Sequence, residues 1–330
     1  MNITVLGSGA WGTALAINLA QRHTVTLWGR DAVQLMQFAV TRENQRYLPG
    51  CKLPANVRVE TDLVAALRDC ELILSVVPTN GLRGMLQALT ATDCHAPIVW
   101  ACKGFEAGSS KLPHEIMKEV CGADRRYGVL SGPSFALEVA QGKPAALTLA
   151  SDNAEFARDL AQQLHGRRLR VYSSTDVIGV ELGGALKNVM AIAAGICDGM
   201  RLGNNARAAL ITRGLAEISR LGAKLGGQTE TFTGLTGLGD LVLTCTGDLS
   251  RNRKVGLELA QGKSLENILH DLGHVAEGVS TAREAVRLAE KHHIDMPITS
   301  AVSLVLDGKV APAAALDALL SRDAKPEALR

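Results

Sequence analysis

Three glycines near the start of the chain constrain the fold more than any other feature of the sequence. Gly7, Gly9 and Gly12 are spaced G-x-G-x-x-G between an apolar run, residues 2–6, and a segment with helical periodicity. A second apolar run, residues 24–28, follows where a strand–helix–strand unit needs it. In such a unit the glycines permit a tight turn, backbone approach to a pyrophosphate, and close helix–strand packing, while the helix N-terminus holds the anion. The spacing predicts a dinucleotide-binding Rossmann unit; the alternative is an ordinary glycine-rich turn.

The end of the second predicted strand bears on the choice of cofactor. In an NAD-selective site an acidic residue here binds the ribose 2′-hydroxyl, whereas a nearby Arg accommodates the 2′-phosphate of NADP. The strand runs into Gly29, Arg30 and Asp31, so Arg30 stands where a 2′-phosphate would arrive and Asp31 comes one residue late. We therefore expect NADP(H) to be accepted at least as well as NAD(H). The alternative is that Arg30 and Asp31 form a solvated surface pair.

Strand-like and helix-like segments alternate over the first half of the chain. A helical pattern at residues 81–89 lies among the strand-like apolar runs, which are residues 71–78, 97–102, 127–130 and 145–150. Such alternation predicts a doubly wound α/β sheet. From about Asp176 to Arg322 the β-runs give way to Ala-, Leu- and Gly-rich segments with helical periodicity. We expect an N-terminal Rossmann domain over residues 1–176 and an all-helical domain over residues 177–330.

The charge balance and the cysteine spacing argue against several classes of protein. Lys plus Arg (35) nearly balance Asp plus Glu (33), so no strong field draws the chain to nucleic acid or to a membrane surface. The seven cysteines form no C-x-x-C pair, which predicts neither a metal site nor a disulfide framework. The N-terminus lacks the basic leader of a secretory signal. We expect a cytoplasmic protein without stable membrane insertion.

Two segments that follow strand-like runs are candidates for ligand contacts, because ligands of open α/β sheets lie at the carboxyl ends of the strands. Lys103 follows residues 97–102, and the adjacent Gly104 would let a ligand approach; the alternative is a solvated lysine. Residues 131–136, which include Gly132 and Ser134, also follow a strand. Their small and hydroxyl side chains suit either a polar ligand or a helix N-cap, and the sequence leaves both open.

Lys187 is the only charged side chain between Leu182 and Cys197. A lysine on a buried apolar helix must find a partner, reach solvent with its end, or lose its proton. Desolvation lowers the pKa of an amine towards neutrality, which suits a catalytic acid or base. Small residues on the same helical face, such as Gly183 and Gly195, are expected to leave room for a ligand. The alternative is a lysine that reaches solvent from a seam between packed helices.

Two later loops carry polar groups suited to substrate binding. The glycine-rich segment 233–241 contains Asp240. Ser250, Arg251 and Asn252 supply hydroxyl, guanidinium and amide donors in consecutive positions, a grouping that can hold a phosphate. Taken alone, each of these loops is a weak signal.

Together these residues resemble one family, the bacterial-type NAD(P)-dependent glycerol-3-phosphate dehydrogenases. The matching blocks cover nearly the whole chain in the family's order. They are GSGAWGTALA (7–16), ACKGFE (101–106), SGPSFA (131–136), ELGGALKNVMAIAAG (181–195), TGLTGLGDL (233–241), DLSRNR (248–253) and VAEGVSTA (275–282).

The resemblance implies reversible interconversion of glycerone phosphate and sn-glycerol 3-phosphate for phospholipid synthesis, with NADP(H) or NAD(H), by a homodimer. It implies that Lys187 is the proton donor and acceptor at the substrate oxygen. Implied substrate-binding positions are Lys103, Gly132, Ser134, Lys187, Asp240, Ser250, Arg251 and Asn252. Implied cofactor positions are Ser8, Ala10, Trp11, Arg30, Lys103, Ala136, Arg251, Val275 and Glu277, beside the loop glycines Gly7, Gly9 and Gly12.

Two other functions are compatible with the same motifs. One is a dehydrogenase of another small hydroxy acid on the same two-domain plan. The other is a regulatory protein that senses the cofactor without catalysis, in which an isolated buried Lys187 would have no purpose.

Overall fold

The protein forms two compact units, each with its own hydrophobic core. The computed structural model describes residues 1–273 and 275–323. The first unit comprises Met1–Cys102 and Pro113–Val177, and the second comprises Lys103–Leu112 and the chain from Ile178 onward. The sequence analysis placed residues 103–112 in the first domain. They pack with the second unit because Phe105 and Leu112 are buried in its helical core.

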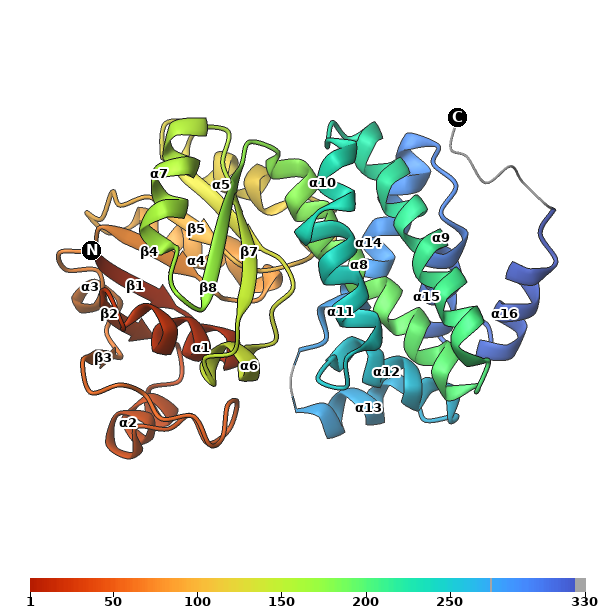
Figure 1. Ribbon diagram of the computed structural model, residues 1–330, viewed down its shortest axis with the longest axis horizontal. Coiled ribbons are helices and arrows are strands. Elements are labelled where there is room, and N and C mark those ends of the chain that lie inside the picture. The colour runs from red at the N-terminus through yellow and green to blue at the C-terminus, as the bar shows by residue number, and fades with distance from the viewer. Residues whose placement is uncertain (274, 324–330) are drawn as a thin grey trace. The chain divides into compact units, whose positions relative to one another are not determined.

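An eight-stranded sheet forms the centre of the first unit (Figure 1). Its strands are β1 (Asn2–Leu6), β2 (Thr24–Trp28), β3 (Val57–Glu60), β4 (Leu72–Ser75), β5 (Ile98–Trp100), β6 (Tyr127–Ser131), β7 (Ala145–Ala150) and β8 (Leu169–Ser174). Their order is β3-β2-β1-β4-β5-β6-β7-β8. All neighbouring pairs are parallel except β6 and β7. The doubly wound sheet expected from the sequence is confirmed.

Seven helices connect and cover these strands. They are α1 (Ala10–Leu19), α2 (Ala32–Thr41), α3 (Leu63–Ala66), α4 (Thr79–Thr90), α5 (Pro113–Cys121), α6 (Ala136–Ala140) and α7 (Ala154–Leu164). Strand order reverses direction at β1, so right-handed crossovers place the helices before and after this point on opposite faces of the sheet. Accordingly, α4 packs beside α5. Helix α6 leads into the antiparallel strand β7, so the crossover rule does not apply to it, and it packs beside α1. The loops after β1 and β4 therefore meet at the topological switch point.

The sequence analysis did not identify β3 or β8. Both lie at the edges of the sheet, so neither carries the continuous apolar run of a buried parallel strand. In β8, buried Leu169 and Val171 alternate with exposed Arg170 and Tyr172. Its polar end, Ser173 and Ser174, lies directly before the change of pattern near Asp176.

All the regular elements among the described residues of the second unit are helices, as expected (Figure 1). Its elements are α8 (Val177–Gly199), α9 (Gly203–Lys224), α10 (Thr229–Thr233), the π-helical turn η1 (Leu235–Gly239), α11 (Asp240–Thr246), α12 (Arg251–Ala260), α13 (Leu265–Leu272), α14 (Glu277–His292), α15 (Pro297–Leu306) and α16 (Pro312–Leu320).

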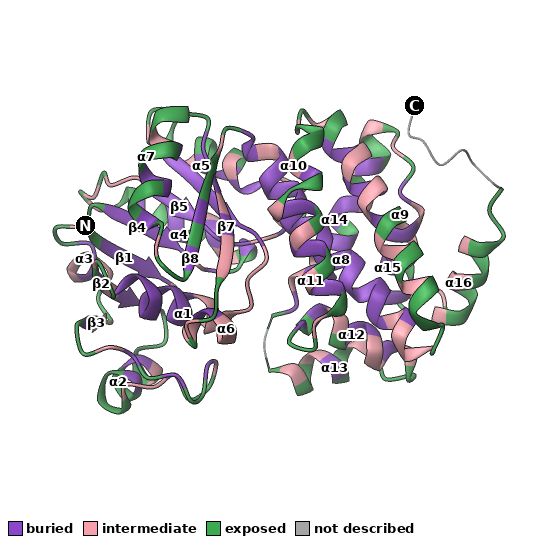
Figure 2. Ribbon diagram, in the orientation of Figure 1, coloured by how far each residue is buried: buried purple, intermediate pink, exposed green. Residues whose placement is uncertain are grey.

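Helix α8 is the buried core helix of the second unit (Figure 2). It is long and apolar enough to cross a membrane by length and composition, but 94% of its most apolar window is buried inside the protein. A Cβ on Gly195 would lie 2.0 Å from the Arg253 carbonyl oxygen, and one on Gly183 would lie 2.7 Å from that of Thr236. Gly183 and Gly195 therefore allow the backbone of neighbouring segments to pack closely against α8. The expectation that they leave room for a ligand is wrong at these two positions.

Candidate active site

Two lysines share one buried carboxylate in the second unit. The Lys187 ammonium, on α8, lies 2.7 Å from Oδ1 of Asp240, and the Lys103 ammonium lies 2.6 Å from Oδ2. The Asp240 side chain is 1% exposed, that of Lys187 9% and that of Lys103 15%. Lys187 therefore has a partner and does not reach solvent, which removes the alternative of a lysine at a helix seam. The three residues come from three separate parts of the chain.

Thr244 completes this arrangement. Lys187 Nζ donates to Thr244 Oγ1 at 2.7 Å, and that hydroxyl donates to the Asp240 backbone carbonyl at 2.6 Å. Asp240 begins α11 directly after the π-helical turn η1, and Thr244 lies four residues later on the same helical face. Sequence reasoning missed Thr244, although its spacing from Asp240 was a usable signal.

Burial and neighbouring charges shift the pKa values of Lys187 and Asp240 in this cluster. Burial lowers the pKa of Lys187, and the nearby Lys103 charge lowers it further, while Asp240 and Glu277 raise it; the net pKa is about 8. Burial raises the pKa of Asp240, but the Lys103 and Lys187 charges outweigh this, so its pKa lies below the ordinary value. At neutral pH a charged carboxylate therefore faces a lysine that is close to its titration point.

The first turn of α12 is held by hydrogen bonds to its neighbours. Ser250 is the N-cap and accepts from the Arg253 backbone N–H at 3.2 Å. The Asn252 side chain donates to Asn188 Oδ1 at 2.9 Å and accepts from the Gly278 N–H at 3.1 Å. Asn252 therefore links α12 to α8, one residue from Lys187, and to the start of α14. Asn188 was not singled out in the sequence analysis.

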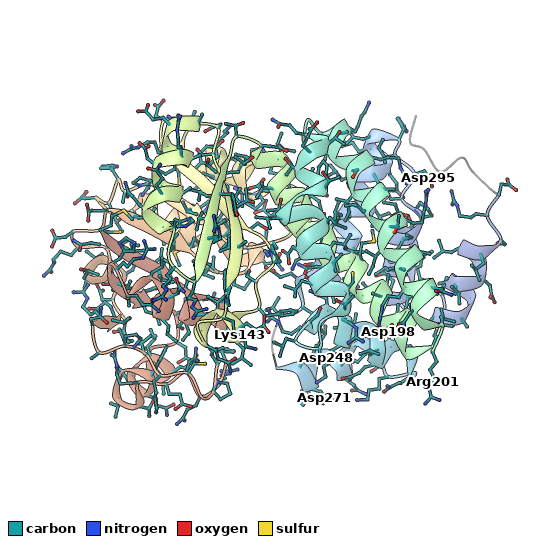
Figure 3. All side chains as sticks on the ribbon, viewed as in Figure 1. Lys143, Asp198, Arg201, Asp248, Asp271 and Asp295 are labelled. Carbon is teal, nitrogen blue, oxygen red and sulfur yellow. The ribbon has the colours of Figure 1, made fainter. Side chains whose placement is uncertain are left out.

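The exposed Arg251 and the partly buried Arg253 have different surroundings at this helix end. Arg253 is 2.7 Å from Asp198 and 3.1 Å from Asp248. Figure 3 labels these two aspartates. The Arg253 guanidinium is therefore engaged in ion pairs with these two carboxylates. Arg251, at the first position of α12, presents its guanidinium to solvent beside the helix N-terminus.

The remaining candidates of the second unit lie where α14 begins. Glu277 is the first residue of α14, and its charge contributes to the pKa of Lys187. Val275 precedes the helix and is 51% exposed. Both positions are thus near the turn that Asn252 fixes through Gly278.

The glycine loop of the first unit has the form that a dinucleotide needs. Gly7 has φ +123°, and a Cβ there would lie 3.0 Å from the Val76 carbonyl carbon. A Cβ on Gly12 would lie 1.9 Å from the Gly7 carbonyl oxygen, whereas one on Gly9 would meet nothing within 4 Å. Gly9 is the N-cap of α1, and no side chain caps this helix. The loop therefore leaves open space for an anion at the α1 N-terminus, beside Ser8, Ala10 and Trp11.

The three residues after β2 differ in their surroundings. Gly29 leaves room for the Ser8 hydroxyl, which a Cβ would approach to 2.3 Å. Asp31 caps α2 by accepting from the Gln34 N–H at 3.0 Å. Arg30 between them is exposed. Arg30 and Asp31 thus have separate environments, and Asp31 acts as a helix cap.

The segment after β6 forms a tight turn into α6. Gly132 has φ +139°, and a Cβ there would lie 3.0 Å from the Ala146 carbonyl oxygen. Ser134 Oγ donates to the Gly132 carbonyl at 3.1 Å. The N-cap of α6 is Phe135 and Ala136 is its first residue, so Ser134 does not cap the helix. Of the two interpretations that the sequence left open, the N-cap is wrong.

Known proteins match the chain over nearly its whole length. The N-terminal domain of the NAD-dependent glycerol-3-phosphate dehydrogenases matches residues 2–157, and the C-terminal domain matches residues 176–317. The chain belongs to this family.

Individual relatives support the same assignment. A protein of Nitrosospira multiformis named glycerol-3-phosphate dehydrogenase (NAD(P)+) is 59% identical over 331 residues, with 99% of each chain covered. One of the same name from Dechloromonas aromatica is 56% identical over 327 residues, again covering 99% of each. The crystal structure of the glycerol-3-phosphate dehydrogenase from Coxiella burnetii has a TM-score of 0.93 at 43% identity, over 97% of this chain and 99% of that one. The family predicted from the motifs is confirmed.

Proposed function

We propose that this protein is an NAD(P)-dependent sn-glycerol-3-phosphate dehydrogenase that reversibly interconverts glycerone phosphate and sn-glycerol 3-phosphate, with Lys187 as the proton donor and acceptor. The observation that carries the proposal is the buried Lys187–Asp240 pair in a member of this family. A lysine whose pKa is about 8 can both give and take a proton near neutral pH.

The bound cofactor supplies the hydride for reduction of the ketone, or accepts it in the reverse direction. In the reduction, Lys187 donates its proton to the oxygen of the former ketone and becomes neutral; solvent then restores the proton. In the oxidation, neutral Lys187 accepts the hydroxyl proton. Asp240 and Thr244 orient the amine in both directions, since each contacts Nζ.

We assign the phosphate of the substrate to the first turn of α12. Arg251 supplies the guanidinium, and Ser250 and Asn252 shape the helix end. Binding energy from the phosphate then fixes the reacting carbon beside Lys187. Lys103, Gly132 and Ser134 complete the proposed substrate contacts.

The cofactor is assigned to two parts of the chain. The α1 N-terminus, at the loop from Gly7 to Gly12, would hold its pyrophosphate, and Arg30 would hold the 2′-phosphate of NADP. Ala136, Lys103, Arg251, Val275 and Glu277 are the other proposed cofactor contacts. We further propose a cytoplasmic homodimer whose product supplies the glycerol backbone of phospholipids.

One assay tests the function directly. Purified protein with NADPH is followed at the nicotinamide absorbance while glycerone phosphate is added, and then while a panel of non-phosphorylated ketones and 2-keto acids is added. Consumption that requires the phosphorylated ketone is the expected result. Faster turnover of a keto acid identifies a different dehydrogenase, and cofactor binding without turnover identifies a sensor.

A further inference from the structure

A buried glutamate outside the proposed active site holds the loop that carries Lys103. Glu284 lies on α14 and is 4% exposed. It accepts from the Gly108 N–H at 3.0 Å and from the Ser110 hydroxyl at 2.7 Å. It also accepts from the Arg287 guanidinium, one turn later on α14, at 3.0 Å. Two of these three donors come from the segment Lys103–Leu112.

A buried carboxylate is a costly way to pack a helix against a loop. Its desolvation is offset only when several donors surround it, and an apolar side chain of similar size would stabilise the core at least as well. Charge-assisted hydrogen bonds, however, fix the positions of their donors more narrowly than apolar contact does. The arrangement around Glu284 therefore favours a role in positioning the loop.

The loop between the two attachment points is short and internally bonded. The Ser110 N–H donates to the Glu106 carbonyl at 3.0 Å, and the Glu106 N–H donates to the Lys111 carbonyl at 2.9 Å. Gly108 and Ser110 both have positive φ, +83° and +56°. One end of this closed turn is held by Glu284, while at the other end Lys103 reaches Asp240.

We propose that Glu284 is a positioning residue for the reaction: it fixes the loop Lys103–Leu112 on α14, and thereby keeps Lys103 on Asp240 beside Lys187. This inference rests on the proposed function for its catalytic meaning. The competing explanation is that Phe105, which is buried in the core of the same unit, holds Lys103 in place without Glu284.

The chain offers matched variants that separate these explanations. Glu284→Ala removes both loop contacts, and Ser110→Ala removes one of them from the loop side without emptying the core. Ser109→Ala is the control, because its hydroxyl donates to Glu106 in the same loop and does not contact Glu284. Glu284→Gln keeps an oxygen that can accept from the Gly108 N–H, and its NH₂ group can donate to the Ser110 hydroxyl oxygen.

The first readout is chemical labelling of Lys103 in the protein without substrate. An acetylating reagent is followed by mass spectrometry, with the exposed Lys309 as internal reference. Glu284→Ala removes two charge-assisted hydrogen bonds to the loop, so it is expected to label Lys103 at least about tenfold faster. Ser110→Ala and Glu284→Gln are expected to give smaller increases, because the first keeps the Gly108 contact and the second keeps both contacts without the charge, while Ser109→Ala matches the wild type.

The second readout is the pH profile of turnover. The charges that act on Lys187 are Asp240 on α11, Glu277 on α14 and Lys103 on the loop. If Lys103 withdraws, its repulsion disappears and the profile's midpoint moves to higher pH, with kcat/KM lower by about tenfold in Glu284→Ala. A merely structural role lowers the amount of folded protein and leaves this midpoint in place.

Failure of the inference about Glu284 can be distinguished from failure of the proposed dehydrogenase function. Labelling needs no substrate, so it tests the loop even if glycerone phosphate is not reduced. Wild-type labelling of Lys103 in both Ser110→Ala and folded Glu284→Ala overturns the inference. So does faster labelling in Ser109→Ala to the same degree as in Ser110→Ala. If Glu284→Ala does not fold, Ser110→Ala against Ser109→Ala decides.

Discussion

The Lys187 ammonium lies 2.7 Å from Oδ1 of Asp240, and both side chains are buried. A second lysine, Lys103, occupies the other oxygen of the same carboxylate. One negative charge is therefore shared by two positive ones. Asp240 thus offsets only part of the desolvation cost of the Lys187 ammonium, and the pKa of Lys187 stays below its ordinary value. This is the physical reason that a lysine can exchange protons near neutral pH at this place.

Replacing Lys187 tests whether it is the proton donor and acceptor. Lys187→Ala is expected to lower kcat in both directions by at least ~10²-fold, the usual contribution of a general acid or base. Steady-state rates with NADPH and glycerone phosphate, beside the variant's thermal unfolding curve, provide the measurement. Near-normal turnover in a folded variant would assign the proton transfer to another group.

The pKa of about 8 for Lys187 gives opposite pH dependences for the two directions. Oxidation of sn-glycerol 3-phosphate needs the neutral amine, so its kcat/KM rises as pH increases through about 8. Reduction of glycerone phosphate needs the ammonium, so its kcat/KM falls over the same range. Measurements above pH 7 keep the substrate phosphate largely dianionic. Profiles that run in the same direction for both reactions would contradict the assignment.

Asp240 and Lys103 are expected to move these profiles in opposite senses. Asp240→Asn removes the charge that raises the pKa of Lys187, so the midpoint moves to lower pH. Lys103→Met removes a charge that lowers it, so the midpoint moves to higher pH. Both variants lose activity, roughly 10²-fold for Asp240→Asn, because each residue also belongs to the proposed site. The direction of the midpoint is therefore the decisive observable.

Gly9 and Gly12 of the same motif are expected to respond differently to alanine. Gly12→Ala places a Cβ against the Gly7 carbonyl oxygen and should destabilise the fold by about 1–3 kcal/mol or more. Gly9→Ala meets only open space, so its Tm should stay near that of the wild type while NADPH affinity falls by about tenfold or more. Thermal unfolding and fluorescence titration with NADPH measure the two effects. Unchanged NADPH affinity in Gly9→Ala would place the pyrophosphate elsewhere.

Arg30 is expected to set the preference for NADP over NAD. Arg30→Ala should reduce kcat/KM for NADPH roughly tenfold while that for NADH changes little, because a charge-assisted contact to the 2′-phosphate is lost. The side chain is exposed, so the fold should be unaffected. Arg68→Ala, another exposed arginine of the first unit, is the control. An unaltered ratio of the two cofactors would leave Arg30 a solvated surface residue.

The Rossmann unit, the division into two domains and the candidate Lys187 could be predicted from the sequence alone, because each depends on a local pattern. The glycine spacing requires only the turn around Gly7 and the helix that follows, and a solitary charge in an apolar helix marks Lys187 without knowledge of its neighbours. The change from strand-like to helical periodicity near Asp176 depends likewise on adjacent residues. Buried strands were identifiable by their apolar runs, whereas the edge strands β3 and β8, exposed on part of their surface, were not.

Only the tertiary structure decided what these residues contact. Lys103 and Asp240 are 137 residues apart in sequence, and nothing local connects them. Whether Gly195 makes room for a ligand or for a neighbouring helix depends on where α12 packs, and it is the Arg253 carbonyl that occupies the space. The hold of Glu284 on a loop more than 170 residues away has no sequence signature either. Such contacts arise from the folded chain as a whole, since packing brings together side chains whose own neighbours carry no information about one another.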